Sequence, residues 1–245
     1  MGPLLFLVFI NDLPECIQST CKIFADDVKI YRPLHDPGFD ISILQADLIR
    51  LSDWSRTWQL GISYEKCKVL CFNFSHDCPL CIDDHVLDSD ASSVRDLGVL
   101  FTSDFGWKPH CSCLCSKAFR IANCILRALS FKCILHFRKA FVAYCRPVLE
   151  YCTQIWSPST VSDICCVENI QKYFTRVAFR MCFPGLFSPC YRQRLAIFGL
   201  KSLEYRRVEF DLILCFKIVR GLCCIKFDDV FPLQKFRLGG QIAFS

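Results

Sequence analysis

The sequence has few glycines and prolines, the residues that most often interrupt helices and strands, and it has no long hydrophobic run. Glycine and proline occur only 10 and 11 times in 245 residues, whereas hydrophobic residues make up 53%. This composition excludes a disordered, collagen-like or low-complexity chain. The longest apolar run, residues 3–10, is followed at once by Asn11 and Asp12. A membrane-spanning helix needs about 20 apolar residues, so we expect no transmembrane segment and no membrane partner.

Targeting signals are equally scarce at the N-terminus. No basic residue precedes the apolar run, no small-residue cleavage site follows it, and Phe6 stands where a myristoylation signal has Ser or Thr. We therefore expect an intracellular protein, cytoplasmic or nuclear, that is not secreted. In such a compartment the 20 cysteines are expected to be reduced and to act mostly as small buried hydrophobes.

Charge divides the sequence into two different halves. Residues 1–107 carry 8 Lys and Arg against 16 Asp and Glu, whereas residues 108–245 carry 21 against 8. A strongly basic half is typical of a module that binds a polyanion, and an acidic half can hold cations. The alternative is that the basic residues are scattered, solvated charges on helix surfaces.

The acidic half combines helical and strand patterns. Residues 3–13, closed by Pro14, predict a short buried helix, and residues 21–31 predict a β-hairpin with Asp26-Asp27 as its turn. A long amphipathic helix, ended by Gly61, follows from apolar residues spaced three or four apart. Those residues are Ile41, Leu44, Leu48, Leu51, Trp54 and Trp58. Strand-like runs follow at residues 68–74 and 94–101.

The basic half reads as mainly helical. We predict helices over residues 109–131, 137–151, 160–182 and 200–219. Pro147 should kink or break the second helix, Ser162-Asp163 should cap the third, and Gly221 lies just past the end of the fourth. The fold class is therefore α+β, with one domain over residues 1–107 and a mainly helical one over residues 108–245.

The segment Phe24-Ala25-Asp26-Asp27 carries the clearest chemical signal. Two adjacent carboxylates at a tight turn can both point towards a hard cation such as Mg²⁺, which takes oxygen ligands and keeps substrate phosphates. Two such ions about 4 Å apart would clamp the attacking and leaving oxygens of a nucleotidyl transfer. The alternative is ordinary turn chemistry, in which Asp is common.

Several segments, in the right order, resemble the reverse transcriptase of non-LTR (LINE-like) retrotransposons, particularly the jockey and CR1 groups. They are Gly2–Phe6 with Ile10–Pro14, Phe24–Asp27 with Ile30-Tyr31, Trp54 and Trp58 with Leu60–Lys66, Arg95–Val99 with Trp107 and His110, Arg146–Tyr151 with Ile155–Pro158, and Arg192–Leu195 with Gly199-Leu200 and Arg206-Arg207. The resemblance covers nearly the whole chain.

The resemblance implies an RNA-directed DNA polymerase, which adds dNTPs to a DNA primer on an RNA template with Mg²⁺ as cofactor. Residues 1–107 would be part of the polymerase palm, and residues 108–245 the thumb and connection region. Asp26 and Asp27 fall on two adjacent catalytic, metal-binding aspartates. Lys66 falls on a motif lysine that can protonate or neutralise the departing pyrophosphate. Ser63 stands where the family usually has Asn.

One departure from the family affects activity. The family's first catalytic aspartate lies upstream of the motif in which Met1 stands, so we expect an N-terminally truncated fragment that is inactive alone. The alternatives are a non-catalytic remnant that binds nucleic acid through its basic half, and a helical protein-interaction module.

Two further groups of residues are candidates for ligand binding, one for phosphates and one for zinc. Phosphate contacts with a template–primer duplex are predicted for arginines of the basic half. These are Arg176, Arg180, Arg192, Arg194, Arg206 and Arg207. Cys78 and Cys81 lie near His76 and His85, which are zinc-ligand types, but no second pair has the spacing of a zinc finger, so we expect no zinc.

Overall fold

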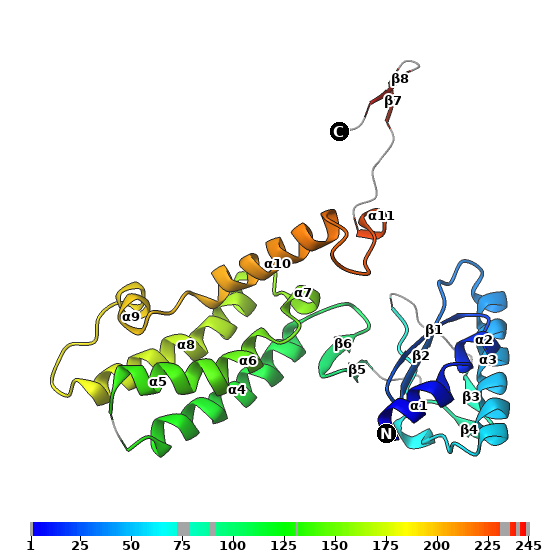
Figure 1. The fold of residues 1–245 in the computed structure, drawn as a ribbon, viewed down its shortest axis with the longest axis horizontal. Coiled ribbons are helices and arrows are strands. Elements are labelled where there is room, and N and C mark those ends of the chain that lie inside the picture. Colours follow the sequence, from blue (N-terminus) through cyan, green and yellow to red (C-terminus); the bar gives the residue numbers. More distant parts are fainter. Residues whose placement is uncertain are drawn as a thin grey trace. The chain divides into compact units, whose positions relative to one another are not determined.

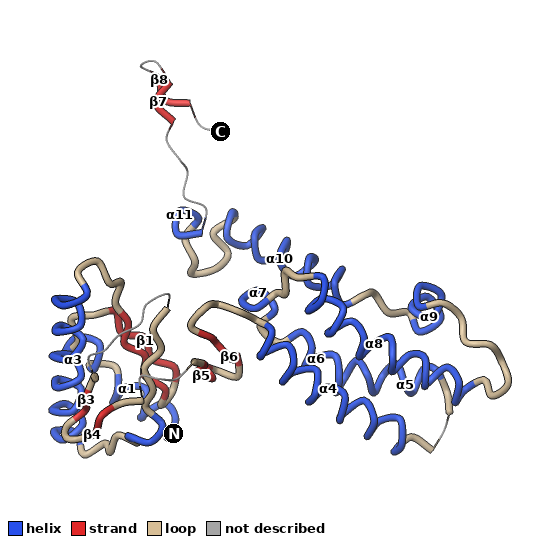
Figure 2. Tube along the Cα trace, turned by 180° about the vertical axis from the view of Figure 1, so that it is seen from behind, coloured by secondary structure: helices blue, strands red, loops and turns tan. Residues whose placement is uncertain are grey.

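A computed structural model of the protein describes residues 2–72, 79–88, 92–130, 132–230, 236–238 and 241–243. The chain divides into two compact units. Unit 1 contains residues 1–94 with 102–105, and unit 2 contains residues 95–101 with 106–245. Figure 1 labels the helices and strands along the chain, and Figure 2 separates them by type.

Unit 1 places two short hairpins and two short helices around one long helix. Its elements are α1 (Gly2–Ile10), α2 (Leu13–Cys16), β1 (Thr20–Phe24), β2 (Asp27–Tyr31), α3 (Pro37–Trp58), the 3₁₀ turn η1 (Tyr64–Lys66), β3 (Cys81–Ile82) and β4 (His85–Val86). One apolar cluster gathers Ile10, Leu13 and Trp54, and a second gathers residues around Leu80 and Leu87. The inner side of α3 contributes to both clusters.

The predicted N-terminal helix forms, but as two pieces and largely unburied. Pro14 lies inside α2, near its start, where a missing N–H costs nothing. Leu4 and Leu5 of α1 are 70% and 64% exposed. Because α1 is apolar on every side, only one of its stripes can pack against unit 1.

The amphipathic helix is confirmed, whereas its predicted end is wrong. Asp36 caps α3 by accepting a hydrogen bond from the Phe39 N–H, and Gln59, not Gly61, takes the left-handed conformation after its last turn, with φ 56°. The predicted strand at 68–74 is also wrong over its described part. Residues 68–72 form only an isolated bridge, from Lys68 to Asp88, and residues 73–74 lie outside the described part.

The predicted strand at 94–101 is instead a hairpin. β5 (Ser93–Asp96) and β6 (Val99–Thr102) pair around Leu97 and Gly98, which both have positive φ. Positive φ at both turn positions matches the twist that tight hairpins require. The hairpin lies where the chain passes from unit 1 to unit 2.

Unit 2 is built mainly from helices. Its elements after the hairpin are α4 (Lys108–Ala128), α5 (Ile134–Ala140), the π-helical segment η2 (Phe141–Cys145), α6 (Arg146–Glu150), α7 (Thr153–Trp156), α8 (Val161–Cys182), α9 (Tyr191–Phe198), α10 (Leu203–Val219), α11 (Phe227–Val230), β7 (Phe236–Leu238) and β8 (Gln241–Ala243). Both views show α4, α6 and α8 side by side. Phe137, Phe141, Leu149, Trp156 and Phe174 are fully buried in the core.

Helix ends in unit 2 differ from their predicted positions. The break in the 137–151 helix is the wide π-helical segment before Pro147, which itself stands near the start of α6. Thr160, not Ser162-Asp163, caps α8 by accepting from the Asp163 N–H. The 200–219 helix begins only at Leu203, after the cap Ser202, while Gly221 has the positive φ expected just past its end.

The mixture of helices and short antiparallel hairpins is compatible with the predicted α+β class, whereas the palm and thumb assignments stay predictions. Across the described ranges, no helix combines the length and apolar character needed to cross a membrane.

Candidate functional site

The two adjacent aspartates lie at the tip of the hairpin formed by β1 and β2. Cys21 pairs with Ile30 and Ile23 with Val28, and these four side chains face the first apolar cluster. The turn is one residue earlier than predicted, because Phe24 pairs with Asp27. Ala25, with φ 53°, and Asp26 therefore form the turn, and Asp27 begins β2. Both aspartates are exposed.

A buried carboxylate on α3 binds the backbone just before the first strand of this hairpin. Asp47 is fully buried and accepts hydrogen bonds from the backbone N–H groups of Gln18 and Ser19, both at 2.8 Å. Arg50 adds an ion pair at 2.5 Å. Burial alone would raise the pKa of Asp47, but the hydrogen bonds from Ser19, Gln18 and Arg50 outweigh it and lower the pKa. The start of β1 is thereby fixed to α3.

A second buried carboxylate on α3 binds the segment that follows the second strand of the hairpin. Asp40 accepts hydrogen bonds from Arg32 Nε at 2.7 Å and from the His35 and Asp36 N–H groups at 2.8 and 2.9 Å. The Arg32 bond, with these two N–H groups, lowers the pKa of Asp40 to about 2. Asp40 and Asp47 are seven residues apart, so they share one side of α3. Both aspartates stand at positions on the inner side of α3, where the other residues are mostly apolar. An aspartate at such a position is the sequence signal that could have identified these buried carboxylates.

The chain contains another Asp-Asp turn, which provides a useful contrast. Asp83 and Asp84 form the turn between β3 and β4, and Asp83 also has a positive φ. Its carboxylate accepts from Ser52 at 2.6 Å, from Tyr64 at 2.9 Å and from Arg56. Asp83 thus links the β3–β4 hairpin to α3 and η1 within unit 1.

No comparable partner engages the first pair. Among the described residues, no side-chain hydrogen bond or ion pair involves Asp26 or Asp27. Two adjacent exposed carboxylates without a structural role suit a hard cation, which prefers oxygen ligands. The described ranges contain no group of three His, Cys, Asp or Glu that could hold a metal ion. The residues present therefore fit Mg²⁺ as two ligands of an incomplete set.

Lys66 lies in the same unit, at the end of the 3₁₀ turn η1. Its backbone N–H donates to the Ser63 carbonyl at 3.0 Å, and its side chain is exposed. Tyr64 connects this turn to the β3–β4 hairpin through Asp83 and stacks on His85 at 4.1 Å. No hydrogen bond or ion pair of the described residues joins Lys66 to Asp26 or Asp27.

The six predicted phosphate-binding arginines fall into two groups. Arg176, Arg180 and Arg192 are exposed, on α8 and α9, and none has an ion pair among the residues that the structure describes. Burial lowers the pKa of nearby Arg194, and the charges of Arg176 and Arg180 lower it further. Arg176 and Arg180 therefore lie near Arg194, which is on α9, the helix that also carries Arg192. We call Arg176, Arg180 and Arg192 the arginine surface.

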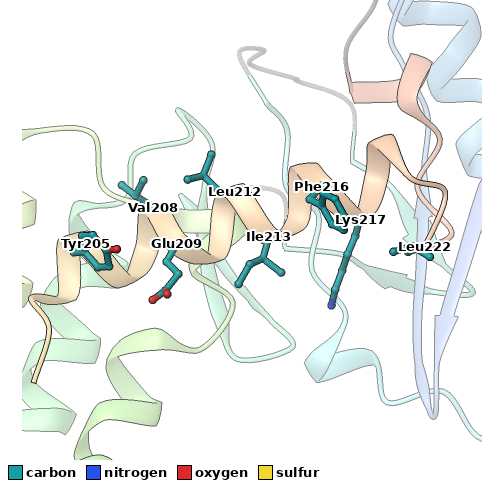
Figure 3. A pocket seen from close by; sticks show the side chains of 8 residues that line it. All are labelled: Tyr205, Val208, Glu209, Leu212, Ile213, Phe216, Lys217 and Leu222. Atoms are coloured by element: carbon teal, nitrogen blue, oxygen red, sulfur yellow. The ribbon is translucent and has the colours of Figure 1, made fainter.

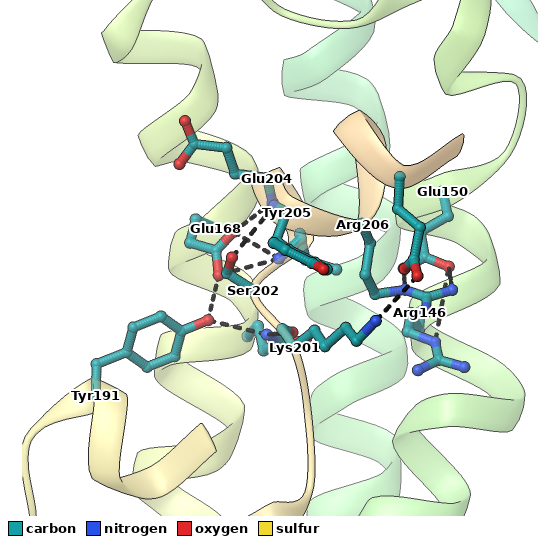
Figure 4. Close-up of polar contacts among 12 residues, drawn as sticks. Arg146, Glu150, Glu168, Tyr191, Lys201, Ser202, Glu204, Tyr205 and Arg206 are labelled. Carbon is teal, nitrogen blue, oxygen red and sulfur yellow. Dashed lines mark hydrogen bonds and ion pairs between the residues drawn. The ribbon is translucent and has the colours of Figure 1, made fainter. Parts of the chain in front are cut away.

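The other three arginines are buried or half-buried in unit 2. Arg194 is 7% exposed and donates to the Thr175 hydroxyl and to the carbonyls of Pro189 and Lys172. Arg206 pairs through two nitrogens with Glu150, which also lies 3.7 Å from Arg146 (Figure 4). Arg207 is 2% exposed. Its two terminal nitrogens are buried without a hydrogen-bond partner among the described residues. Arg194 and Arg206 therefore hold unit 2 together, and all three side chains are less exposed than the arginine surface.

A buried glutamate that the sequence did not single out positions the last long helix. Glu168 on α8 accepts hydrogen bonds from the N–H groups of Leu203 and Glu204, at the start of α10, and from the Tyr191 hydroxyl (Figure 4). A carboxylate is favoured at the positive N-terminal end of a helix. Burial and the bond to Glu168 raise the pKa of Tyr191. This contact ties α8, α9 and α10 together.

Two transposon proteins of Drosophila melanogaster are similar to this chain. A probable RNA-directed DNA polymerase from transposon X-element is 26% identical over 189 residues, which cover 72% of this chain and 20% of that protein. A probable RNA-directed DNA polymerase from transposon BS is 22% identical over 187 residues, with 70% and 20% covered. The chain thus spans about a fifth of the length of these relatives.

A further relative is an uncharacterized protein of Caenorhabditis elegans, 23% identical over 117 residues, which cover 48% of this chain and 58% of that protein. No family model matches the chain, and no solved structure matches it. The zinc-ligand types His76 and Cys78 lie outside the described residues. The weak similarity to transposon polymerases over most of the chain supports a reverse-transcriptase-like relationship.

Proposed function

We propose that this chain carries the metal-binding hairpin and a nucleic-acid-binding region of an RNA-directed DNA polymerase from a non-LTR, LINE-like retrotransposon. The observation that carries the proposal is the pair Asp26 and Asp27, in a chain similar to transposon polymerases. Both are exposed at a hairpin tip, and neither side chain has a hydrogen bond or ion pair with the described residues. The reaction would add dNTPs to a DNA primer on an RNA template.

We assign a different role in this reaction to each group of candidate residues. Asp26 and Asp27 would supply carboxylate oxygens to Mg²⁺, which when bound offsets negative charge on the reacting phosphate. Lys66 would neutralise the departing pyrophosphate. The arginine surface would contact phosphates of the template–primer duplex, whose shape and backbone can be read without base contacts.

The isolated 245-residue chain is proposed to be inactive, because the described residues supply no third carboxylate beside the pair. Loss of one direct metal ligand removes several kcal/mol of charge stabilisation, and each 1.36 kcal/mol is about tenfold in rate. Purified chain should show no Mg²⁺-dependent dNTP incorporation on a primed RNA template. Incorporation that Asp26→Ala abolishes would contradict this part of the proposal.

Metal binding tests the hairpin without needing activity. We expect Mn²⁺, a paramagnetic substitute for Mg²⁺, to broaden the NMR signals of residues around the β1–β2 turn. Asp26→Asn and Asp27→Asn should each weaken this broadening, whereas Asp84→Asn, at the other Asp-Asp turn, should leave it unchanged. Broadening that is absent, or equal in all three variants, would refute the metal role.

A non-catalytic nucleic-acid-binding remnant is the second candidate function. The exposed arginine surface favours it, because those charges lie in unit 2 and need no metal ligand from the hairpin. Salt-dependent binding of a primed RNA template without any Mn²⁺ effect at the hairpin would support this candidate over the first.

A further inference from the structure

The loop between α8 and α9 exposes an aromatic side chain to solvent. Phe187 is 96% exposed, more than any other large apolar residue that the structure describes, and Leu186 before it is 62% exposed. Among the described residues, no aromatic ring contacts that of Phe187. The ring therefore adds nothing to the packing of unit 2 and is available to a ligand.

A tight turn fixes the start of this loop. The Leu186 N–H donates to the Phe183 carbonyl at 3.2 Å, with Pro184 and Gly185 between them. Gly185 has φ 89°, the positive value that the second central position of a type II turn requires, and proline favours the first. Phe187 follows the turn directly. Because the backbone before it is already ordered, binding through this ring costs little conformational entropy.

The other end of the loop is fixed beside the arginine surface. Arg194 donates to the Pro189 carbonyl at 2.6 Å, two residues after Phe187. Burial lowers the pKa of Arg194, and Arg176 and Arg180 lie near enough for their charges to lower it further. The contacts of Arg194 therefore place the exposed loop next to members of the arginine surface.

The charge of this region favours a polyanion as the ligand. Residues 169–203 contain six Lys and Arg and no Asp or Glu. Arg180 is seven residues before Phe187 and Arg192 is five residues after it, so each Cα atom lies within about 25 Å of that of Phe187. Both arginines are exposed and have no ion pair among the described residues. A membrane contact would instead use the apolar face of a whole helix.

A second exposed apolar surface of unit 2, on α10, differs in its charge. Leu212 and Phe216 are 65% and 55% exposed there, and the carboxylate of Glu209 lines the same groove (Figure 3). Glu209 pairs with Lys201 at 2.9 Å. This groove therefore lacks the uninterrupted positive charge of the α8–α9 loop, and Phe216 provides a matched control for Phe187.

We propose that Phe187 stacks on an unpaired base of the nucleic acid whose phosphates the arginine surface contacts. The inference rests on the proposed function and adds a preference for single-stranded nucleotides. An unpaired base offers its flat face to an aromatic ring, and such stacking raises affinity about tenfold or more whatever the base. Bases within a duplex are already stacked on one another, so Phe187 adds little to duplex binding.

Fluorescence anisotropy with two strands of equal length tests the stacking, one an unstructured single-stranded RNA and the other an abasic strand with the same number of phosphates. The wild type should bind the RNA about tenfold or more tightly than the abasic strand. Phe187→Ala should lose about tenfold in affinity for the RNA and leave binding of the abasic strand unchanged. Phe216→Ala should change neither affinity.

Two further variants show whether an aromatic ring is needed. Phe187→Trp should retain the affinity for RNA, because an indole ring also stacks on bases. Phe187→Leu is apolar but has no flat ring, so it should lose affinity as Phe187→Ala does. Circular dichroism establishes that each variant is folded. Full affinity of Phe187→Leu would overturn the stacking.

Salt titration separates this inference from the proposed function. Phe187→Ala should leave the slope of log affinity against log salt unchanged, because stacking releases no counterions, whereas Arg180→Ala should reduce it. A wild type that binds both strands equally with a steep slope would overturn the stacking and leave the proposed function standing. A wild type that binds neither strand would contradict both. Binding to phosphatidylserine vesicles that requires Phe187, without preference for bases, would identify a membrane surface and overturn the inference.

Discussion

Charged residues of this protein differ most in whether their side chains are already bound. Asp40, Asp47 and Glu168 are buried and accept several hydrogen bonds each, whereas Asp26 and Asp27 are exposed and accept none from side chains of the described residues. Buried carboxylates are maintained only where such bonds offset desolvation. The first group therefore supports the fold, and the second is available to a ligand.

Removing Asp47 should destabilise unit 1. Asp47→Ala removes the acceptor of the Gln18 N–H and of the buried Ser19 N–H and leaves the Arg50 charge unpaired, and we expect a loss of about 2–4 kcal/mol in the free energy of unfolding. Urea denaturation measures this change. Asp53→Ala, at an exposed position of the same helix, should change it by less than about 0.5 kcal/mol. Equal effects of the two substitutions would contradict the anchoring role.

Asp40 should make unit 1 sensitive to acid. Its pKa in the folded chain is about 2, below the usual 3.8, so ionised Asp40 stabilises the fold above that usual value. This contribution should be lost as the pH falls from about 4 to about 2. Urea unfolding of wild type and Asp40→Asn should differ at pH 6, and the difference should shrink over this range. A constant difference would refute the assignment.

Two neighbouring arginines should behave oppositely. Arg194→Ala removes three internal hydrogen bonds and should lower the stability of unit 2 by about 2–3 kcal/mol without changing the salt dependence of nucleic-acid binding. Arg180→Ala should leave stability unchanged and reduce the slope of log affinity against log salt by about 0.9. Thermal unfolding and salt titration separate the two effects. The reverse pattern would show that Arg194 reaches the duplex.

At the scale of helices and strands, periodicity predicted the elements better than their ends. The amphipathic α3 and the β1–β2 hairpin follow from side chains that face one apolar cluster. Their ends depend on single residues with positive φ, here Gln59 and Ala25, which no pattern marks because glycine is the usual residue there. The π-helical segment before Pro147 depends on tertiary packing and was equally hidden.

The corrected end of α3 can be tested by exchange of glycine. Gln59→Gly should stabilise unit 1 by about 0.5–1 kcal/mol, because glycine adopts positive φ without strain. Gly61 has no positive φ, so Gly61→Ala should leave stability unchanged or raise it slightly. Thermal unfolding compares the two variants. Destabilisation by Gly61→Ala alone would favour Gly61 as the true end.

At the scale of the whole molecule, the change in charge near residue 107 predicts two domains, and this division stays a prediction. The sequence identified the carboxylate pair and the excess of arginine, because both are visible in composition and motif. It did not distinguish exposed Arg176 from buried Arg194, since that difference depends on which side of α8 and α9 faces the core. The structural roles of the buried carboxylates Asp40, Asp47 and Glu168 could not be predicted from the sequence for the same reason.

The claim that both candidate functions share is that unit 2 binds a template–primer duplex through the arginine surface, and it is therefore the central one. Fluorescence anisotropy with a primed RNA template, titrated against salt, measures it most directly. We expect steep salt dependence for the wild type, with the slope reduced by about 2–3 when Arg176, Arg180 and Arg192 are all changed to Ala. A control with Arg120, Arg127 and Lys139 changed to Ala removes the same charge from other exposed positions and should retain most of the slope. Absence of binding, or equal slopes in the two triple variants, would contradict the account.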